Sequence, residues 1–421
     1  LATTEVTTAA SGYGGAVRPT PSPDGTSLAF IRRDRDTTEL WVKNLTTGVE
    51  RMIYGDLDLD MQETWAVYGF YPRMDWTPDG SAIVAWAGGK IRRIAADGSG
   101  SSVIPFQIDD TRGVADAPHP VIPVGEDSFT AKIPRFASVS PDGRTVVFES
   151  LGKLYTKPLG GGEPRQFLSD DSDALELWPS WSRDGRRVAF VRWTDDGLGQ
   201  VMTADANGRN VRAVTSTRGH YAQPQFSPDG NTIVFEKRSG GYLTSPEYSE
   251  NEGVYSVSAN GGTPTLVARD TTDPQFGADD DRLFMLGRSG GKLQLLSATL
   301  TGDRRQVHAE GELVSGYSVS PRGDMLAFRE NYEVFVTPLL PGGQAVTLGE
   351  KASSLPATRA SKGGADYIGW TDGGSTLTWS MGPTLYRAPT SAMFSNAPLA
   401  KDAPKFTPPA SGISLARTIR A

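Results

Sequence analysis

The sequence predicts an all-β protein, namely a β-propeller built from four-stranded antiparallel blades. A turn phrase, Ser-Pro-Asp-Gly or a close variant, occurs eight times and is mostly repeated at intervals of about 42 to 55 residues; its copies begin at residues 22, 77, 140, 182, 227, 277, 320 and 371. A fixed period of this size indicates stacked supersecondary units. No stretch longer than one turn shows the 3.6-residue apolar period of a helix.

Each repeat contains the elements of one blade. Pro sets φ at the second turn position, Asp bonds back to nearby backbone, and Gly accepts a positive φ. Residues 178–181 exemplify the strand before the phrase, and residues 187–191 exemplify the apolar strand after it. A further strand and a Gly-Gly or Asn-Gly turn follow, and a short outer strand such as residues 210–215 completes the unit. A large β-sandwich is the rival fold, but it gives no reason for such regular turns.

The repeats set the expected domain organisation. Eight phrases predict eight blades, with seven as the alternative, over residues 1–395. Two long periods predict insertions at about residues 55–72 and 107–134, and insertions in propellers often lie on the binding face. The eighth unit lacks a clear outer strand, so we expect residues 3–8 to complete it and close the ring. Residues 396–421 are expected to form a tail or linker.

Composition excludes several classes of function. The chain has 421 residues, a net charge of −7 and no basic cluster interleaved with aromatic residues, which argues against nucleic acid as the main partner. It contains no cysteine, so disulfides and thiol chemistry are excluded. No apolar run is long enough to span a membrane. The first residue is Leu, from which we expect that an export signal has been removed.

Catalytic motifs are largely missing. The three histidines, His119, His220 and His308, form neither His-x-His nor His-Glu-x-x-His, so no metal site is predicted in this chain. No Gly-x-Ser-x-Gly elbow occurs, and Ser150 and Lys153 match Ser-x-x-Lys only across a predicted turn. Two carboxylates facing across a channel would suit a glycosidase. The repeated Asp residues are better explained as turn formers, and the acidic loops as solvated rather than calcium-binding.

The repeat resembles that of TolB-like propellers. The shared pattern is Pro-x-Phe/Trp-Ser-Pro-Asp-Gly, a β run ending in Phe, Leu-Tyr/Trp-Val and then Gly-Gly, and it covers nearly the whole chain. The resemblance implies a propeller found either free in the periplasm or beside peptidase and amidohydrolase domains.

A closer resemblance is to exported bacterial amidohydrolases that carry such a propeller ahead of a catalytic barrel. It rests on Asp-Met-Gln-Glu-Thr-Trp at residues 60–65, Tyr-Pro-Arg-Met-Asp-Trp at 71–76, Phe-Arg-Glu-Asn-Tyr at 328–332 and Gly-Pro-Thr-Leu-Tyr at 382–386. It implies zinc or another divalent metal in the barrel, which this chain does not include, and a peptide or amide substrate. No catalytic or metal residue can be assigned here.

Three functions follow as hypotheses. The first is a non-catalytic module that docks a hydrolase barrel and controls substrate access, in the periplasm or secreted. The alternatives are a free-standing periplasmic scaffold and, less favoured, a propeller glycosidase. The candidate residues for binding a substrate or partner are an aromatic group in the first insertion and a pair ahead of the fifth phrase: Met61, Glu63, Trp65, Tyr68, Tyr71, His220 and Tyr221.

Overall fold

The structure is a computed structural model. It describes residues 6–12, 14–34, 37–58, 60, 73–115, 125–170, 172–239, 251–340, 342–351, 355–394 and 406–420. The chain divides into two compact units: unit 1 comprises residues 1–122 and 240–248, and unit 2 comprises residues 123–239 and 249–421. Nearly all regular structure is β, which confirms the predicted fold class.

Unit 1 contains two four-stranded antiparallel sheets. The first is β1 (Val17–Pro21), β2 (Ser27–Asp34), β3 (Thr37–Asn44) and β4 (Glu50–Tyr54), and the second is β5 (Met74–Trp76), β6 (Ala82–Ala87), β7 (Lys90–Ala95) and β8 (Ser101–Val103). Ile31 and Leu40 of the first sheet pack with Ile83 and Ile94 of the second in one buried cluster. These two sheets therefore share a core, as neighbouring blades do.

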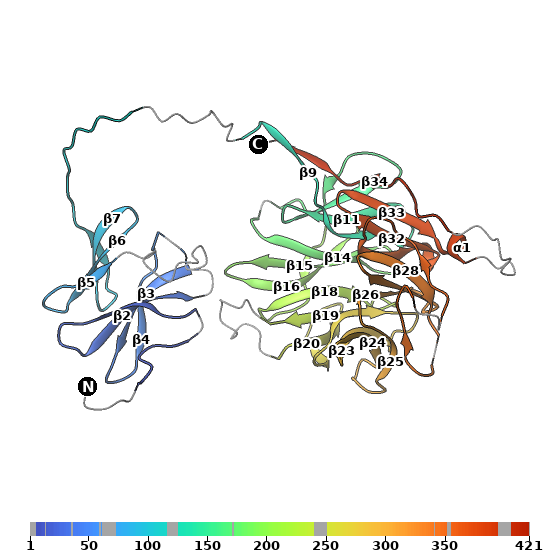
Figure 1. Ribbon diagram of the computed structural model, residues 1–421, viewed down its shortest axis with the longest axis horizontal. Helices are drawn as coiled ribbons and strands as arrows, with labels where there is room; N and C mark the ends of the chain where they lie inside the picture. The colour runs from blue at the N-terminus through green and yellow to red at the C-terminus, as the bar shows by residue number, and fades with distance from the viewer. Residues whose placement is uncertain are drawn as a thin grey trace. The chain divides into compact units, whose positions relative to one another are not determined.

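Unit 2 contains six successive sheets with the same strand order (Figure 1). The first three are β10 (Arg135–Val139), β11 (Thr145–Ser150), β12 (Lys153–Pro158) and β13 (Arg165–Gln166); β14 (Leu175–Trp181), β15 (Arg187–Thr194), β16 (Leu198–Asp205) and β17 (Arg212–Ala213); and β18 (His220–Phe226), β19 (Thr232–Arg238), β20 (Gly253–Ser258) and β21 (Thr265–Ala268).

The last three sheets are β22 (Thr272–Phe276), β23 (Leu283–Ser289), β24 (Lys292–Ala298) and β25 (Gln306–Gly311); β26 (Val314–Val319), β27 (Met325–Glu330), β28 (Glu333–Pro338) and β30 (Thr358–Arg359); and β31 (Asp366–Thr371), β32 (Thr376–Met381), β33 (Thr384–Pro389) and β34 (Ile413–Ser414). Between β28 and β30, the strand β29 (Val346–Thr347) pairs in parallel with β25 of the preceding sheet. The helical elements among the described residues are short: η3 (Asp372–Gly374) and α1 (Thr390–Met393).

The repeated phrase forms the turn between the first two strands of each sheet. In the fifth copy the Ser227 hydroxyl donates to Asp229 Oδ1 at 2.5 Å, and the backbone N–H of Asn231 donates to the same oxygen at 2.9 Å. These hydrogen bonds lower the pKa of Asp229. Gly230 has φ +74° and donates its N–H to the carbonyl oxygen of Ser227. The phrase is therefore a structural turn, as its residue types predict.

The core lies within and between the sheets. A Phe at the middle of the second strand is almost fully buried in five sheets; these residues are Phe30, Phe148, Phe190, Phe235 and Phe328. Clusters of buried side chains bridge neighbouring sheets, as where Val191 of β15 packs with Ile233 of β19. Burying an apolar side chain contributes about 1.5–3 kcal/mol, so these interfaces hold the blades together.

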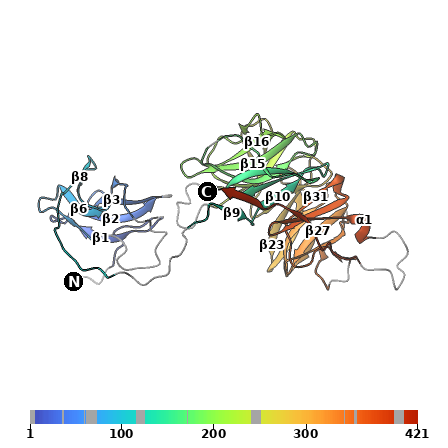
Figure 2. The same ribbon diagram turned by 90° about the horizontal axis from the view of Figure 1, so that it is seen from above.

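The six sheets of unit 2 close into a ring by contacts between the first and the sixth. The Thr371 hydroxyl donates to the carbonyl oxygen of Ser140 at 2.7 Å, and the N–H of Asp372 donates to that of Pro141 at 3.0 Å. Strands β10 and β31 lie side by side (Figure 2). The sequence predicts one ring of eight blades. Eight sheets of blade type are present among the described residues, but six of them close a ring by themselves.

The strand that completes the last sheet also differs from the prediction. The sequence assigns this role to residues 3–8, whereas β34 pairs with β33 and residues 6–8 lie outside any strand. Leu415, beside β34, is only 1% exposed and packs with Leu385 and Phe148. Strand β35 (Arg417–Arg420) then pairs with β9 (Ser128–Ala131), which lies within the predicted second insertion. Burial of Leu415 explains why the predicted tail, rather than the N-terminal segment, joins the ring.

Candidate functional site

The ring of unit 2 surrounds a cavity of about 860 Å³. The innermost strands of all six sheets, β10, β14, β18, β22, β26 and β31, contribute lining residues. These strands start at one end of the cavity, called here the mouth, and run to the Ser-Pro-Asp-Gly turns at the other, called the turn end. Each innermost strand has a strand partner on one side only, so its second edge faces the cavity.

A β-bulge near the start of each innermost strand shapes the mouth. The register shifts in all six, for example between Leu177 and Ser180 of β14. In five of them a non-glycine residue adopts a left-handed backbone conformation with φ between +50° and +54°; these residues are Phe136, Trp178, Gln223, Asp273 and Tyr367. All five line the cavity. Such conformations are strained, and bulges of this kind redirect side chains next to functional sites.

Aromatic side chains gather at the mouth. The ring centroids of Phe136 and Trp178 are 5.1 Å apart, and those of Phe136 and Tyr367 are 5.4 Å apart with an edge-to-face geometry. The guanidinium of Arg238 lies 5.2 Å from the Trp178 ring centroid, and that of Arg135 lies 5.5 Å from the centroid of Phe136. The mouth therefore combines apolar ring surface with cationic groups.

A buried carboxylate holds one of the strained residues. Glu236 of β19 is 4% exposed and accepts a hydrogen bond of 2.8 Å from Arg238 Nε and one of 3.3 Å from the backbone N–H of Asp273. The side chain of Asp273 is partly exposed on the cavity side. Burial, reinforced by the nearby Glu236 charge, raises the pKa of Asp273 to about 7, against the opposing effect of Arg238 and Arg329. Asp273 is therefore partly protonated near neutral pH.

A second ion pair links the fifth and sixth sheets at the mouth. Arg329 Nη1 donates to Asp366 Oδ1 at 2.6 Å, and Arg329 Nε donates to the Ser315 hydroxyl at 2.9 Å. The acidic residues that line the mouth, Glu236, Asp273 and Asp366, thus lie close to arginine side chains.

The turn end is dominated by one arginine. The fourth copy of the phrase is Ser-Arg-Asp-Gly, and its Arg183 donates from Nη1 to the carbonyl oxygen of Pro321 at 2.8 Å. Its Nη2 donates to the carbonyl oxygens of Gly277 at 2.5 Å and Phe276 at 3.2 Å. Burial lowers the pKa of Arg183, and Asp280 opposes that shift. Since Arg183 lies in the first turn of the second sheet and Pro321 in the first turn of the fifth, the Arg183 side chain crosses the ring.

Side chains also fasten neighbouring innermost strands to one another. Trp181 Nε1 donates to the carbonyl oxygen of Ser138 at 3.1 Å. The Gln275 amide donates to the carbonyl oxygen of Tyr317 at 3.0 Å and accepts from the N–H of Val319 at 2.8 Å. These hydrogen bonds fix the spacing of the strands around the cavity, which favours a preformed site.

Only two of the predicted site residues lie within the described part of the chain. Met61, Glu63, Trp65, Tyr68 and Tyr71 lie outside it. Tyr221 of β18 is 4% exposed, packs against Phe235 and shares a hydrogen bond of 3.0 Å with the Thr217 hydroxyl.

His220 packs against Trp193 with ring centroids 4.8 Å apart, and burial lowers its pKa. Neither His220 nor Tyr221 lines the cavity, whereas Gln223, two residues further along β18, does. A binding role for the pair stays a prediction.

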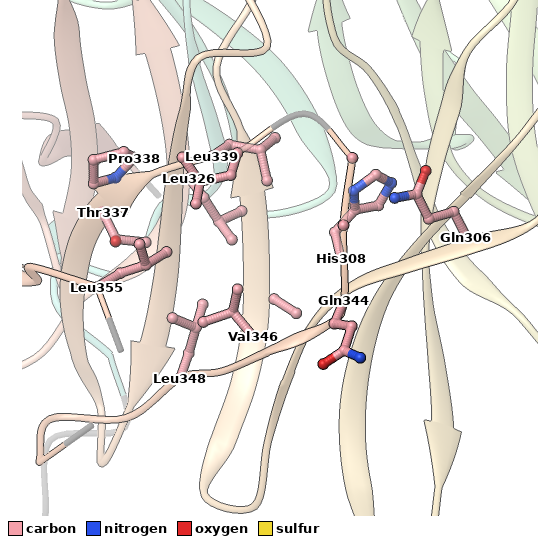
Figure 3. Close-up of a pocket in the computed structure, with 14 residues that line it drawn as sticks. Gln306, His308, Leu326, Thr337, Pro338, Leu339, Gln344, Val346, Leu348 and Leu355 are labelled. Carbon is pink, nitrogen blue, oxygen red and sulfur yellow. The ribbon is translucent and has the colours of Figure 1, made fainter. Parts of the chain in front are cut away.

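A second, smaller cavity of about 190 Å³ lies beside the crossing strand β29 (Figure 3). Leu326, Val346 and Leu348 give it aliphatic walls, and His308 lies at its edge. His308 Nε2 is 2.6 Å from the Ser297 hydroxyl. Burial, with a smaller contribution from Arg282, lowers the pKa of His308 to about 4, so this imidazole is neutral.

The described residues also bear on metal binding and on membrane spanning. In that part of the chain no group of three His, Asp or Glu side chains is arranged to hold a metal ion. None of the helices found there has the length and apolar character needed to cross a membrane.

Comparison with known proteins identifies the kind of propeller. Residues 179–337 match the family model of the TolB beta propeller domain, PD40. An uncharacterized protein of Agrobacterium fabrum is 22% identical over 44% of this chain and 56% of its own length. The Tol-Pal system protein TolB of Francisella tularensis is 26% identical over 26% of this chain and 24% of its own. The chain thus spans about half of the first relative and a quarter of the second.

Among solved structures, TolB from Acinetobacter baumannii is similar with a TM-score of 0.34 and 17% identity, over 68% of this chain and 64% of that one. The residues that match the family model begin in β14 and end in β28, within the ring of unit 2. The chain therefore contains a TolB-like β-propeller.

Proposed function

We propose that unit 2 is a protein-binding module that holds an extended segment of a partner in its central cavity. The cavity lined by all six sheets is the observation that carries this proposal. The two TolB-like relationships support a binding role over a catalytic one.

The backbone of the innermost strands supports recognition of an extended chain. Each of these strands is hydrogen-bonded to a neighbouring strand on one side only. Exposed strand edges bind extended peptides through main-chain hydrogen bonds, which supply affinity without demanding one sequence. Six such edges surround the cavity, so a segment entering it meets a strand edge of every sheet.

The side chains of the mouth supply the contacts that discriminate between partners. Trp, Tyr and Arg are the residue types that contribute most to protein interfaces. Trp178, Tyr367 and Arg238 are of these types and line the cavity. The left-handed backbone at Trp178 and Tyr367 sets the direction of their side chains before any partner arrives, which reduces the entropy lost on binding.

The proposed setting is the periplasm, because the similarity to the Tol-Pal system protein TolB supports a scaffold of that kind. Docking of an amidohydrolase barrel, with its divalent metal and its peptide or amide substrate, remains a prediction from the sequence, as does glycosidase activity. Separate expression of the propeller and such a barrel, followed by calorimetric titration, tests the docking hypothesis directly.

The binding role is tested with a fluorescein-labelled pool of randomised hexapeptides. The protein is equilibrated with the pool and separated by gel filtration, and the retained label is measured. We expect retention by the wild type, a loss of at least about tenfold for Trp178→Ala, as for an interface hot spot, and no change for Trp86→Ala. Trp86 is 44% exposed and does not line the cavity, so it is a matched control. Equal retention by both variants and the wild type would overturn the proposal.

A further inference from the structure

We propose that the cavity binds the carboxy-terminal end of a partner chain, with the terminal carboxylate received by Arg183. This inference rests on the proposed function and adds to it a chemical group and a direction. It starts from Arg183, which interrupts the repeated phrase with a charge where the other Ser-x-Asp-Gly turns of that form carry Pro.

Arg183 has binding capacity that the protein leaves unused. A guanidinium carries five N–H donors. Three hydrogen bonds from Arg183 occur in the described part of the chain, all from Nη1 and Nη2 to carbonyl oxygens, so its Nε–H and one further N–H are without a protein acceptor there. Arg183 lines the cavity. Donors of an arginine fork match the two oxygens of a carboxylate.

The charge of Arg183 is also uncompensated by any contact. None of the ion pairs among the described residues includes Arg183. Asp184, the next residue, is occupied by its own turn, where it accepts from the Ser182 hydroxyl at 2.6 Å and from the N–H of Arg186 at 3.0 Å. A partly buried cation that contacts only carbonyl dipoles attracts an anion more strongly than an exposed one does.

The charges along the cavity give the bound chain a direction. At the mouth the acidic lining residues, Glu236, Asp273 and Asp366, are accompanied by the lining arginines Arg238 and Arg329, so that end carries charges of both signs. The charged lining residues of the turn end are both cationic, Arg183 and Arg322. A chain that enters with its carboxylate foremost places its negative end at Arg183. The opposite orientation would place an ammonium group against two arginines.

A terminal carboxylate fits this position better than an acidic side chain in mid-sequence. The side chain of Arg183 runs from the second sheet to carbonyl groups of the fourth and fifth, so it crosses the path of a chain along the ring axis. The innermost strands are five to seven residues long. At about 3.3 Å per residue, a hexapeptide is long enough to reach from the mouth to Arg183.

The experiment compares two forms of the randomised hexapeptide pool, both labelled with fluorescein at the N-terminus. One pool ends in a free carboxylate and the other in an amide. In the wild type we expect about tenfold greater retention of the acid pool, the ratio that one charged hydrogen-bonded contact supplies. In Arg183→Gln this ratio falls to about one, and in Arg212→Gln it is unchanged, since Arg212 is exposed on the outer strand β17.

Each outcome separates the inference from the function beneath it. Equal retention of both pools by the wild type overturns the carboxylate inference and leaves peptide binding intact, whereas retention of neither pool overturns the proposed function itself. If Arg183→Gln does not fold, the acid-to-amide retention ratio of the wild type is measured between 0.05 and 0.5 M NaCl, roughly one decade of ionic strength. An electrostatic contact makes this ratio fall as the salt concentration rises. A constant ratio contradicts the carboxylate inference.

Discussion

Arg183 donates a hydrogen bond of 2.8 Å to the carbonyl oxygen of Pro321, and the two residues belong to turns on opposite sides of the ring. Two sheets lie between them in either direction around the ring of six. This contact therefore links distant parts of unit 2 directly, in addition to any role in binding.

Replacing Arg183 with Pro restores the repeated phrase and removes this link. The Ser-Pro-Asp-Gly copies show that the turn accepts Pro, so the backbone is retained. We expect the free energy of unfolding to fall by about 2 kcal/mol, since hydrogen bonds from a charged donor are lost. Urea denaturation followed by tryptophan fluorescence measures this. Arg186→Ala, whose arginine side chain is 85% exposed in the same turn, should change stability by less than about 0.5 kcal/mol.

Leu415→Ala tests which end of the chain completes the sixth sheet. Leu415 is 1% exposed among Leu385, Val146 and Phe148, so truncating it should cost about 3 kcal/mol of stability. Val6→Ala, at a residue that is 96% exposed, should cost nothing measurable. Hydrogen exchange of the β33 amides provides a local measurement. If the β33 amides exchange faster in Val6→Ala but at the wild-type rate in Leu415→Ala, the N-terminal segment rather than β34 completes the sheet.

Asp273→Asn should alter how stability depends on pH. The pKa of Asp273 is raised from 3.8 to about 7 in the folded state, so its protonated form stabilises the fold below about pH 4 and that contribution is lost as pH rises towards 7. Asn stays neutral and tolerates a φ of +53°.

The Asp273→Asn variant should therefore gain melting temperature relative to the wild type at pH 8 and show a smaller difference between pH 5 and pH 8. Asp270→Asn, at an exposed position that also has a positive φ, is the control. A wild-type melting temperature that rises steadily between pH 5 and pH 8, with the same slope in Asp273→Asn, would show that Asp273 is not perturbed in this way.

Trp181→Phe should weaken the junction between the first and second sheets. The change keeps an aromatic ring but removes the hydrogen bond from Nε1 to the carbonyl oxygen of Ser138. The free energy of unfolding should therefore fall by about 1 kcal/mol. Trp370→Phe removes the corresponding bond to the carbonyl oxygen of Ser318 between the fifth and sixth sheets. Because the two junctions are separate, the free energy of unfolding of the double variant should fall by the sum of the two single decreases. Trp86→Phe serves as the exposed control.

The turns could be predicted from sequence because their cause is local. Ser227, Asp229 and Gly230 each act within a few residues of their own position, so the phrase carries its own structure. Strand β34 could not be found this way, since Ile413 and Ser414 show no alternation and acquire their role from the burial of the adjacent Leu415. Closure of the ring is a long-range property, and a repeat count alone does not determine how many sheets it includes.

The candidate site was predictable only in part. The positive φ of Trp178 or Asp273 has no signature in these residue types, because bulges of this kind depend on the neighbouring strand and on anchors such as Glu236. Arg183 did leave a signal, since it replaces the Pro of an otherwise intact Ser-Pro-Asp-Gly copy. A departure from a structural repeat was thus a sequence signal for a residue that lines the cavity.

The pairing of β34 with β33 has a consequence for the order of events during synthesis. A ribosome makes residues 413–420 after every innermost strand of the ring. Until they emerge, the outer edge of β33 is unpaired and the interface around Leu385 is incomplete. Exposed edges and apolar surface favour association between nascent chains. The sixth sheet is therefore the last to be completed, and its outer edge is open to association until residues 413–420 have been made.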